Sequence, residues 1–133
     1  ILLKPTTLSI LIGVNDTWRR YDNNDPTSTE DFERGYRSIL ARARDELNVK
    51  IILMEPFLLP AREELEGWRE DLDPKIGAVR RLAREFGALY VPLDGIFAAE
   101  CMKKPPQFWA GDGVHPTQAG HGLIADAWMK AIV

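Results

Sequence analysis

Three short apolar segments, separated by longer amphipathic stretches, constrain the fold of this chain more than any other feature. They are aliphatic and bounded by polar or turn-forming residues, which is typical of strands buried on both faces, and they cover residues 8–12, 50–54 and 88–91. Strands that alternate with helices form a parallel sheet with helices on its faces. We therefore expect an α/β fold, in which ligands bind beyond the carboxyl ends of the strands.

The intervening stretches predict helices. Apolar residues recur at helical spacing from Phe32 to Leu47, and Thr27 with Glu30 predicts a capping box in front of them. A second helix is expected to begin with Asp73 as N-cap and Pro74 as its first residue, and to stop at Gly87. A helical turn over 96–101 and a helix over 116–132 follow. Residues 13–26 are rich in Asn and Asp, and we expect a loop there.

The composition excludes several classes of protein. The chain has 133 residues, 45% of them hydrophobic and 28% charged, which indicates one globular domain rather than a disordered chain. A net charge of -3 without a basic block argues against nucleic acid as a partner. Cys101 is the only cysteine, so no intrachain disulfide can form, and no apolar run approaches the ~18 residues of a membrane span. The compartment and a homo-oligomeric state stay open, with the cytoplasm favoured.

Two short motifs at this sheet edge carry residues suited to acyl transfer. Gly13-Val14-Asn15-Asp16 follows the first strand, and Asp112-Gly113-Val114-His115-Pro116 precedes the last helix. A serine esterase needs a base, a carboxylate that orients it and a donor for the oxyanion. His115, Asp112 and Asn15 suit these three roles, and Gly13 allows close backbone approach.

Each of these residues also has a structural interpretation. Taken alone, His115 fits a surface or capping position, Asp112 a charge at a helix N-terminus, and Asn15 a turn. A zinc site built from Asp112, His115 and His121 lacks further ligands, and phosphate-binding glycine loops are absent. We expect neither a metal nor a cofactor.

Together, the two motifs resemble the G-x-N-D and D-x-x-H blocks of the SGNH, or GDSL-type, esterase and lipase family. The resemblance implies a three-layer αβα sandwich of the flavodoxin-like SGNH type, with five strands in the order 2-1-3-4-5. This chain would supply the last three. The family's G-D-S nucleophile motif is not found, and Ser9, Ser28 and Ser38 lie in other contexts. We therefore expect residues 1–133 to be the C-terminal part of one domain, with on the order of 60 residues or more upstream.

Finer similarity favours the bacterial acetylxylan-esterase and lysophospholipase-like branch. It implies small acyl esters, with acetylated carbohydrates as the leading substrate. Trp18, Arg19 and Tyr21 lie just beyond Asn15 and are candidates for substrate binding, although an aromatic loop equally suits an oligomer contact. That branch carries Trp immediately before the catalytic Asp, whereas this chain has Gly111 there. Long-chain lipolysis, or a non-catalytic domain that binds carbohydrate or assembles with itself, stays open.

Overall fold

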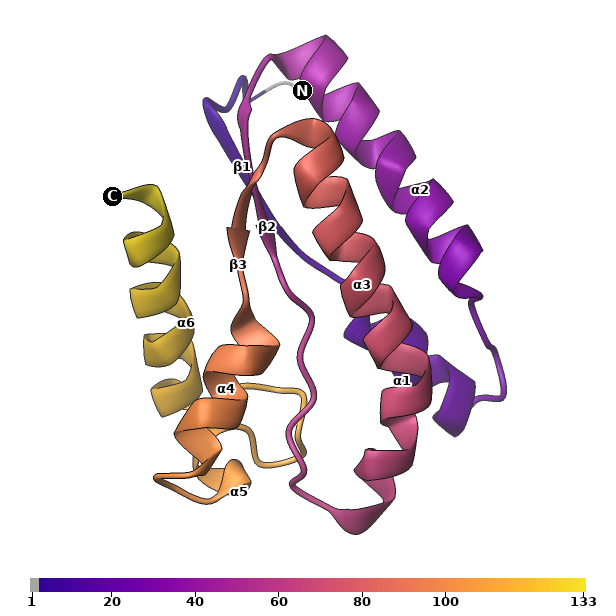
Figure 1. The fold of residues 1–133 in the computed structure, drawn as a ribbon, viewed down its shortest axis with the longest axis vertical. Coiled ribbons are helices and arrows are strands. Elements are labelled where there is room, and N and C mark those ends of the chain that lie inside the picture. The colour runs from indigo at the N-terminus through magenta and orange to yellow at the C-terminus, as the bar shows by residue number, and fades with distance from the viewer. Residues whose placement is uncertain (1–2) are drawn as a thin grey trace.

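The computed structural model describes residues 3–133 and has three layers (Figure 1). The middle layer is a parallel sheet whose strands pair in the order β1-β2-β3. One face is covered by α2 and α3, and the opposite face by α4 and α6. The sheet and its main helices are β1 (Thr7–Leu11), β2 (Lys50–Met54), β3 (Leu89–Val91), α2 (Thr29–Arg42), α3 (Arg69–Phe86), α4 (Leu93–Cys101) and α6 (Gln118–Ile132). The predicted α/β class and parallel strands are confirmed.

Alternate residues of β2 supply both halves of the core. Ile51 and Leu53 pack against Tyr36 and Leu40 of α2 and against apolar residues of α3. Ile52 points the other way, into a cluster that contains Phe97 of α4 and residues of α6. Successive side chains of a strand face opposite sides, so a continuous apolar run is what a doubly covered strand requires.

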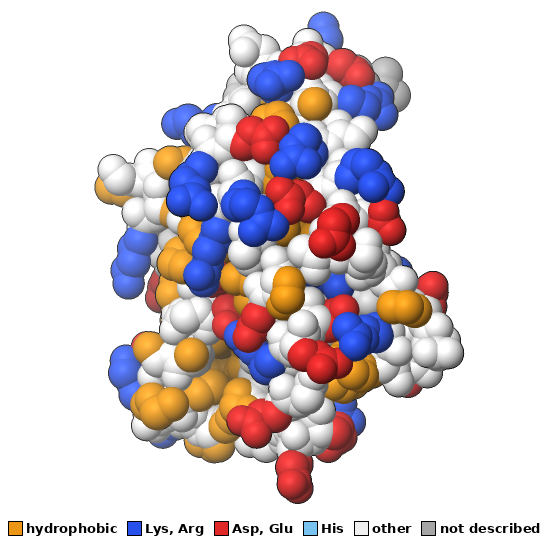
Figure 2. Space-filling view, turned by 45° about the vertical axis from the view of Figure 1, so that its right-hand side comes forward, with side chains coloured by type: hydrophobic (Ala, Val, Ile, Leu, Met, Phe, Trp, Pro, Cys, Tyr) orange, Lys and Arg blue, Asp and Glu red, His pale blue; other side chains and the backbone are white. Residues whose placement is uncertain are grey.

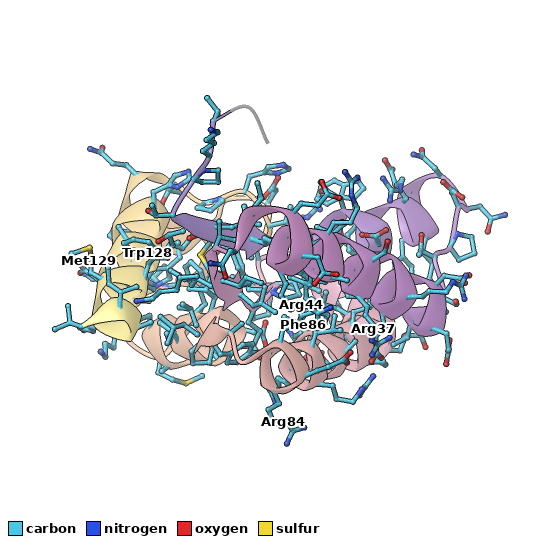
Figure 3. The ribbon with its side chains drawn as sticks, turned by 90° about the horizontal axis from the view of Figure 1, so that it is seen from above. Arg37, Arg44, Arg84, Phe86, Trp128 and Met129 are labelled. Atoms are coloured by element: carbon cyan, nitrogen blue, oxygen red, sulfur yellow. The ribbon has the colours of Figure 1, made fainter. Side chains whose placement is uncertain are left out.

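Charged side chains bind α2 to α3 on the solvent side. Arg37 contacts Glu33 and Glu85, and Arg81 contacts Glu33, at distances of 2.5 to 2.9 Å. Figure 2, which turns this side of the molecule forward, shows positive and negative side chains interspersed. The Arg44 guanidinium, in a π-helical turn η1 (Ala43–Leu47) after α2, lies 5.4 Å from the Phe86 ring centre (Figure 3).

The predicted loop at 13–26 is wrong over most of its length, because residues 14–22 form the helix α1 (Val14–Asp22). Its Asn and Asp residues are compatible with a helix by position. Asp16 lies in the first turn, where a negative charge is favourable, and it pairs with Arg19 at 2.9 Å.

Four predicted helix boundaries shift, including the start of the last helix, which lies at Gln118 and not at residue 116. The N-cap of α2 is Ser28, whose hydroxyl accepts from the Asp31 amide, rather than Thr27. Helix α3 begins at Arg69, after a 3-10 helix η2 (Glu63–Trp68), so Asp73 is no cap and Pro74 lies inside the helix. The 96–101 turn is part of the longer α4, and a short helix α5 (Pro106–Trp109) follows it. The left-handed stop at Gly87 is confirmed.

None of the helices within residues 3–133 combines the length and apolar character that crossing a membrane requires.

Candidate active site

Gly13 forms the turn between β1 and α1. Its φ of 128° lies in a region that favours glycine, and its carbonyl accepts from the amides of Asp16 and Thr17 to begin the helix. A Cβ at this position would lie 3.2 Å from both Phe32 and Pro56. The backbone of Gly13 therefore lies close to the side chains of Phe32 and Pro56, which leave little room for a larger residue.

Helix α1 carries Asn15 in its first turn, shortly after the carboxyl end of β1, and Asn15 is exposed. A buried network of hydrogen bonds anchors the helix. The Thr17 hydroxyl donates to Asp71 Oδ2 at 2.7 Å, and Lys75 Nζ contacts the same oxygen at 2.5 Å. Because Thr17 and Lys75 are fully buried and Asp71 nearly so, this network fixes α1 against α3.

The loop between α5 and α6 brings Asp112 and His115 together. Asp112 Oδ1 accepts from the backbone amides of Val114 and His115, at 3.0 and 2.8 Å. Asp112 Oδ2 lies 2.6 Å from His115 Nδ1. The carboxylate thus shapes the loop with one oxygen and holds the imidazole ring with the other, while the other nitrogen, Nε2, belongs to a ring that is 74% exposed.

The same contacts set the ionisation of Asp112. Partial burial by itself raises the pKa of this carboxyl group, but hydrogen bonds from the His115 amide, the His115 ring and the Val114 amide outweigh it. Their combined effect lowers the pKa of Asp112 to about 2. The group is therefore a carboxylate at neutral pH, as an orienting partner of an imidazole must be.

Gly113 connects this loop to the segment that follows β2. The Leu59 amide donates to the Gly113 carbonyl at 2.9 Å, and Gly113 has a φ of 91°. A Cβ here would lie 2.5 Å from Leu65 Cδ1 and 2.7 Å from the Leu59 carbonyl oxygen. No larger residue fits between these atoms, so Gly113 is a packing requirement that the motif alone did not reveal.

Trp18, Arg19 and Tyr21 lie on α1, not on a loop; Trp18 and Tyr21 share Trp68 as a partner, whereas Arg19 has a different partner. The Trp18 ring meets the His115 ring at a centroid distance of 5.9 Å and an angle of 63°. Tyr21 stacks on Trp68 at 5.1 Å, and Trp68 also meets Trp18 edge-on at 5.3 Å. Arg19 pairs with Asp16 instead.

Trp68 and Asp71 hold α1 beside the candidate site, and sequence reasoning missed both. Both gain their importance from α1, which lies about 50 positions earlier in the chain, so no local pattern marks them. The available signals were an aromatic residue among acidic ones at 63–71, and an acid four residues before a lysine at helical spacing.

Within residues 3–133, no group of three or more His, Cys, Asp or Glu side chains is arranged to hold a metal ion. The Asp112–His115 pair offers a proton-accepting imidazole held by a carboxylate, and its contact with α1 is made by the Trp18 ring.

Comparison with known proteins identifies relatives with this architecture. The family model described as GDSL-like Lipase/Acylhydrolase family matches residues 1–123. An acetylxylan esterase from Geobacillus stearothermophilus is 32% identical over 136 residues, which cover 99% of this chain and 61% of the esterase. This chain therefore spans about three fifths of the length of that relative.

Solved structures give the same result. A Parabacteroides merdae protein described as a GDSL-like lipase superposes with a TM-score of 0.91 at 36% identity, over 98% of this chain and 61% of that protein. The Geobacillus stearothermophilus esterase superposes with a TM-score of 0.87 at 32% identity, over 98% and 61%. Two variants of that esterase are described as catalytic mutants, one with a serine near its N-terminus and one with an aspartate replaced by alanine.

Proposed function

This chain belongs to the GDSL-like lipase/acylhydrolase family, and from that membership we propose that it is the acid-base and oxyanion part of a serine esterase. The observation that carries the proposal is the 2.6 Å contact between His115 Nδ1 and Asp112 Oδ2. This contact holds the ring with Nε2 as the free, basic nitrogen, which a general base requires.

In the proposed reaction, His115 Nε2 takes the proton of a serine hydroxyl as the serine oxygen attacks the ester carbonyl. The side-chain amide of Asn15 donates to the oxyanion, an interaction that typically contributes ~2.7–4 kcal/mol to barrier lowering. The protonated His115 then gives its proton to the departing alcohol. Water, deprotonated by the same nitrogen, hydrolyses the acyl-serine and regenerates the serine.

We place the nucleophilic serine outside these residues, in a segment N-terminal to them. Ser9 accepts a hydrogen bond from Trp128, Ser28 caps α2, and Ser38 lies within α2, so each has a structural setting away from the Asp112 loop. The solved relative, of which this chain covers 61%, has the serine of its catalytic mutant near its N-terminus. Such a segment would add strands beside β1, where Leu11 is 36% exposed and Ile12, just after the strand, is 39% exposed.

The leading substrate class is acetyl esters of carbohydrates. Similarity to an acetylxylan esterase supports it, and so does the aromatic surface of Trp18 and Trp68, of which Trp18 lies beside His115. Flat aromatic rings next to a reactive nitrogen suit a sugar ring that carries its ester at the edge.

The test compares wild-type full-length protein with His115→Ala and His121→Ala, using 4-nitrophenyl acetate and acetylated xylo-oligosaccharides. We expect His115→Ala to lower kcat/KM by at least about a thousandfold. His121→Ala is the matched control, because His121 is the other histidine and lies exposed on α6. It should retain full activity.

Labelling with a fluorophosphonate reports the nucleophile directly. An adduct on a serine upstream of these residues supports the proposal. A His115→Ala protein that keeps most of its activity refutes the assigned base, and a preference for decanoyl over acetyl esters refutes the substrate class in favour of lipolysis.

A further inference from the structure

Arg69 and Asp94 form a bidentate ion pair next to the segment that contacts the Asp112 loop. Arg69 Nη1 donates to Asp94 Oδ1 at 2.8 Å, and Arg69 Nη2 donates to Asp94 Oδ2 at 2.7 Å. Arg69 begins α3 and Asp94 lies in the first turn of α4, so the pair joins elements that cover opposite faces of the sheet. The Arg69 and Asp94 side chains are 32% and 16% exposed, so solvent screens the pair less than it screens a fully exposed one.

The pair forms hydrogen bonds with both the backbone amide and the backbone carbonyl of Leu58. Asp94 Oδ1 accepts from the Leu58 amide at 3.2 Å, and Arg69 Nη1 donates to the Leu58 carbonyl at 3.3 Å. The next residue is Leu59, whose amide donates to Gly113. Two residues after Gly113 comes His115. A continuous series of short contacts therefore leads from the Arg69–Asp94 pair to the imidazole.

Asp94 is itself anchored to the sheet. Its amide donates to Glu55 Oε2 at 3.1 Å, and Glu55, at the carboxyl end of β2, is fully buried. The Tyr90 hydroxyl and the Arg80 guanidinium bind the other oxygen of Glu55. The pair is thus fixed to β2 and β3 rather than to a mobile surface.

A cavity of about 240 Å³ lies next to this pair, lined by Leu58, Leu59, Arg69, Asp94 and Phe97 among others. The side chains of Leu58 and Leu59 are buried in two apolar clusters, but the segment also borders this cavity, where close packing is missing. The polar contacts to the Leu58 backbone add to the packing and fix the segment beside the cavity.

We propose that Arg69 and Asp94 are positioning residues for the reaction. By holding Leu58 and Leu59, they fix the Gly113 carbonyl and thereby the direction of His115 Nε2. The inference rests on the proposed function, since it concerns the placement of the proposed base. Neither residue belongs to the aromatic surface or to the Asp112–His115 pair.

The test uses Arg69→Met and Asp94→Asn in the full-length protein, with Asp73→Asn as the matched control. Asp73 accepts from the same guanidinium at 2.7 Å but makes no contact with Leu58. We expect Arg69→Met and Asp94→Asn to lower kcat for 4-nitrophenyl acetate by roughly 10- to 100-fold with KM within about twofold, because misplacement by about 1 Å costs up to ~100-fold in rate. Asp73→Asn should leave kcat unchanged.

A second readout does not depend on activity. Hydrogen exchange at the Leu59 amide should speed up in Arg69→Met and Asp94→Asn, while exchange in the centre of β2 stays slow, which also shows that the variants are folded. Unchanged Leu59 exchange, or an unchanged kcat, overturns the inference. An inactive wild-type protein refutes the proposed function instead, and Leu59 exchange then still decides whether the pair holds this segment.

Discussion

The Trp18 ring lies 5.9 Å from the His115 ring, although nearly a hundred residues separate them in the chain. Trp18 and Val14 of α1 pack against an apolar cluster that includes Val114 of the Asp112 loop. This contact joins the segment after the first strand to the segment before the last helix. The two motifs are far apart in the sequence, and this apolar packing brings them close together in the fold.

The position of Trp18 predicts a role in binding the sugar part of the substrate. Replacing Trp18 with Ala should raise KM for acetylated xylo-oligosaccharides roughly fivefold, corresponding to about 1 kcal/mol for a lost aromatic contact. The KM for 4-nitrophenyl acetate, which carries no sugar, should change less than twofold. Equal losses with both substrates, measured by steady-state kinetics, would show that Trp18 supports the loop and does not bind sugar.

Gly113 and Gly111 offer a matched pair of substitutions in the same loop. Gly113→Ala forces a side chain against Leu65 and the Leu59 carbonyl at positive φ, and we expect a loss of about 1–3 kcal/mol in unfolding free energy together with a large loss of activity. At Gly111, a Cβ would meet no atom within 4 Å. Gly111→Ala should therefore stay within about 0.5 kcal/mol of wild type and keep its activity. Urea unfolding and ester hydrolysis measure both, and equal behaviour of the two variants would contradict this account.

The strands and the long helices follow from the sequence because their determinants are local. The apolar run at 50–54 becomes β2 without a change in boundaries, and the spacing of Phe32, Tyr36 and Leu40 places all three in the core. Gly87 ends α3 with the expected left-handed conformation. In each case, a residue's own side chain or backbone preference decides the outcome.

Helix α1 could not be predicted in the same way, because much of its stability comes from partners far away in sequence. Thr17 bonds to Asp71, Arg20 to Asp71 and Glu70, and Trp18 packs on Trp68. Locally, the density of Asn and Asp favours a loop, and tertiary contacts override this preference. For the same reason, the roles of Trp68 and Asp71 in the site emerge only from the fold.

The Asp71 network predicts a pH-dependent contribution to stability. Burial by itself raises the pKa of Asp71, but hydrogen bonds from Lys75, Thr17 and Arg20 outweigh it and lower the pKa below its ordinary value of 3.8. Since the folded-state pKa is the lower one, the stabilisation is complete above about pH 4 and is lost as pH falls through the folded-state pKa. Asp71→Asn, which leaves the buried Lys75 ammonium without its carboxylate, should cost about 3–5 kcal/mol at pH 7.

That cost should shrink as pH falls below about 4, because the Asp71 carboxyl group of the unfolded wild-type chain then takes up a proton more readily than that of the folded protein. Urea unfolding at pH 7, 5 and 3 measures the difference. Asp45→Asn is the control, because Asp45 pairs with Arg44 on the exposed surface and should matter little at any of these pH values. A cost for Asp71→Asn that is the same at pH 3 and pH 7 would contradict the ionised network.

Asp112→Asn separates the two tasks of the Asp112 carboxylate. The Asn carbonyl oxygen can still accept from the amides of Val114 and His115, so the loop and the unfolding free energy should change little. The Asn NH₂ group cannot accept from His115 Nδ1; it favours the tautomer whose proton lies on Nε2, the nitrogen proposed to take the serine proton. We therefore expect kcat to fall by about ten thousandfold at neutral pH. Because the pKa of Asp112 is about 2, wild-type protein should show no loss of activity from protonation of this carboxylate above about pH 4. An Asp112→Asn protein that folds normally and keeps its kcat would show that this carboxylate only shapes the loop.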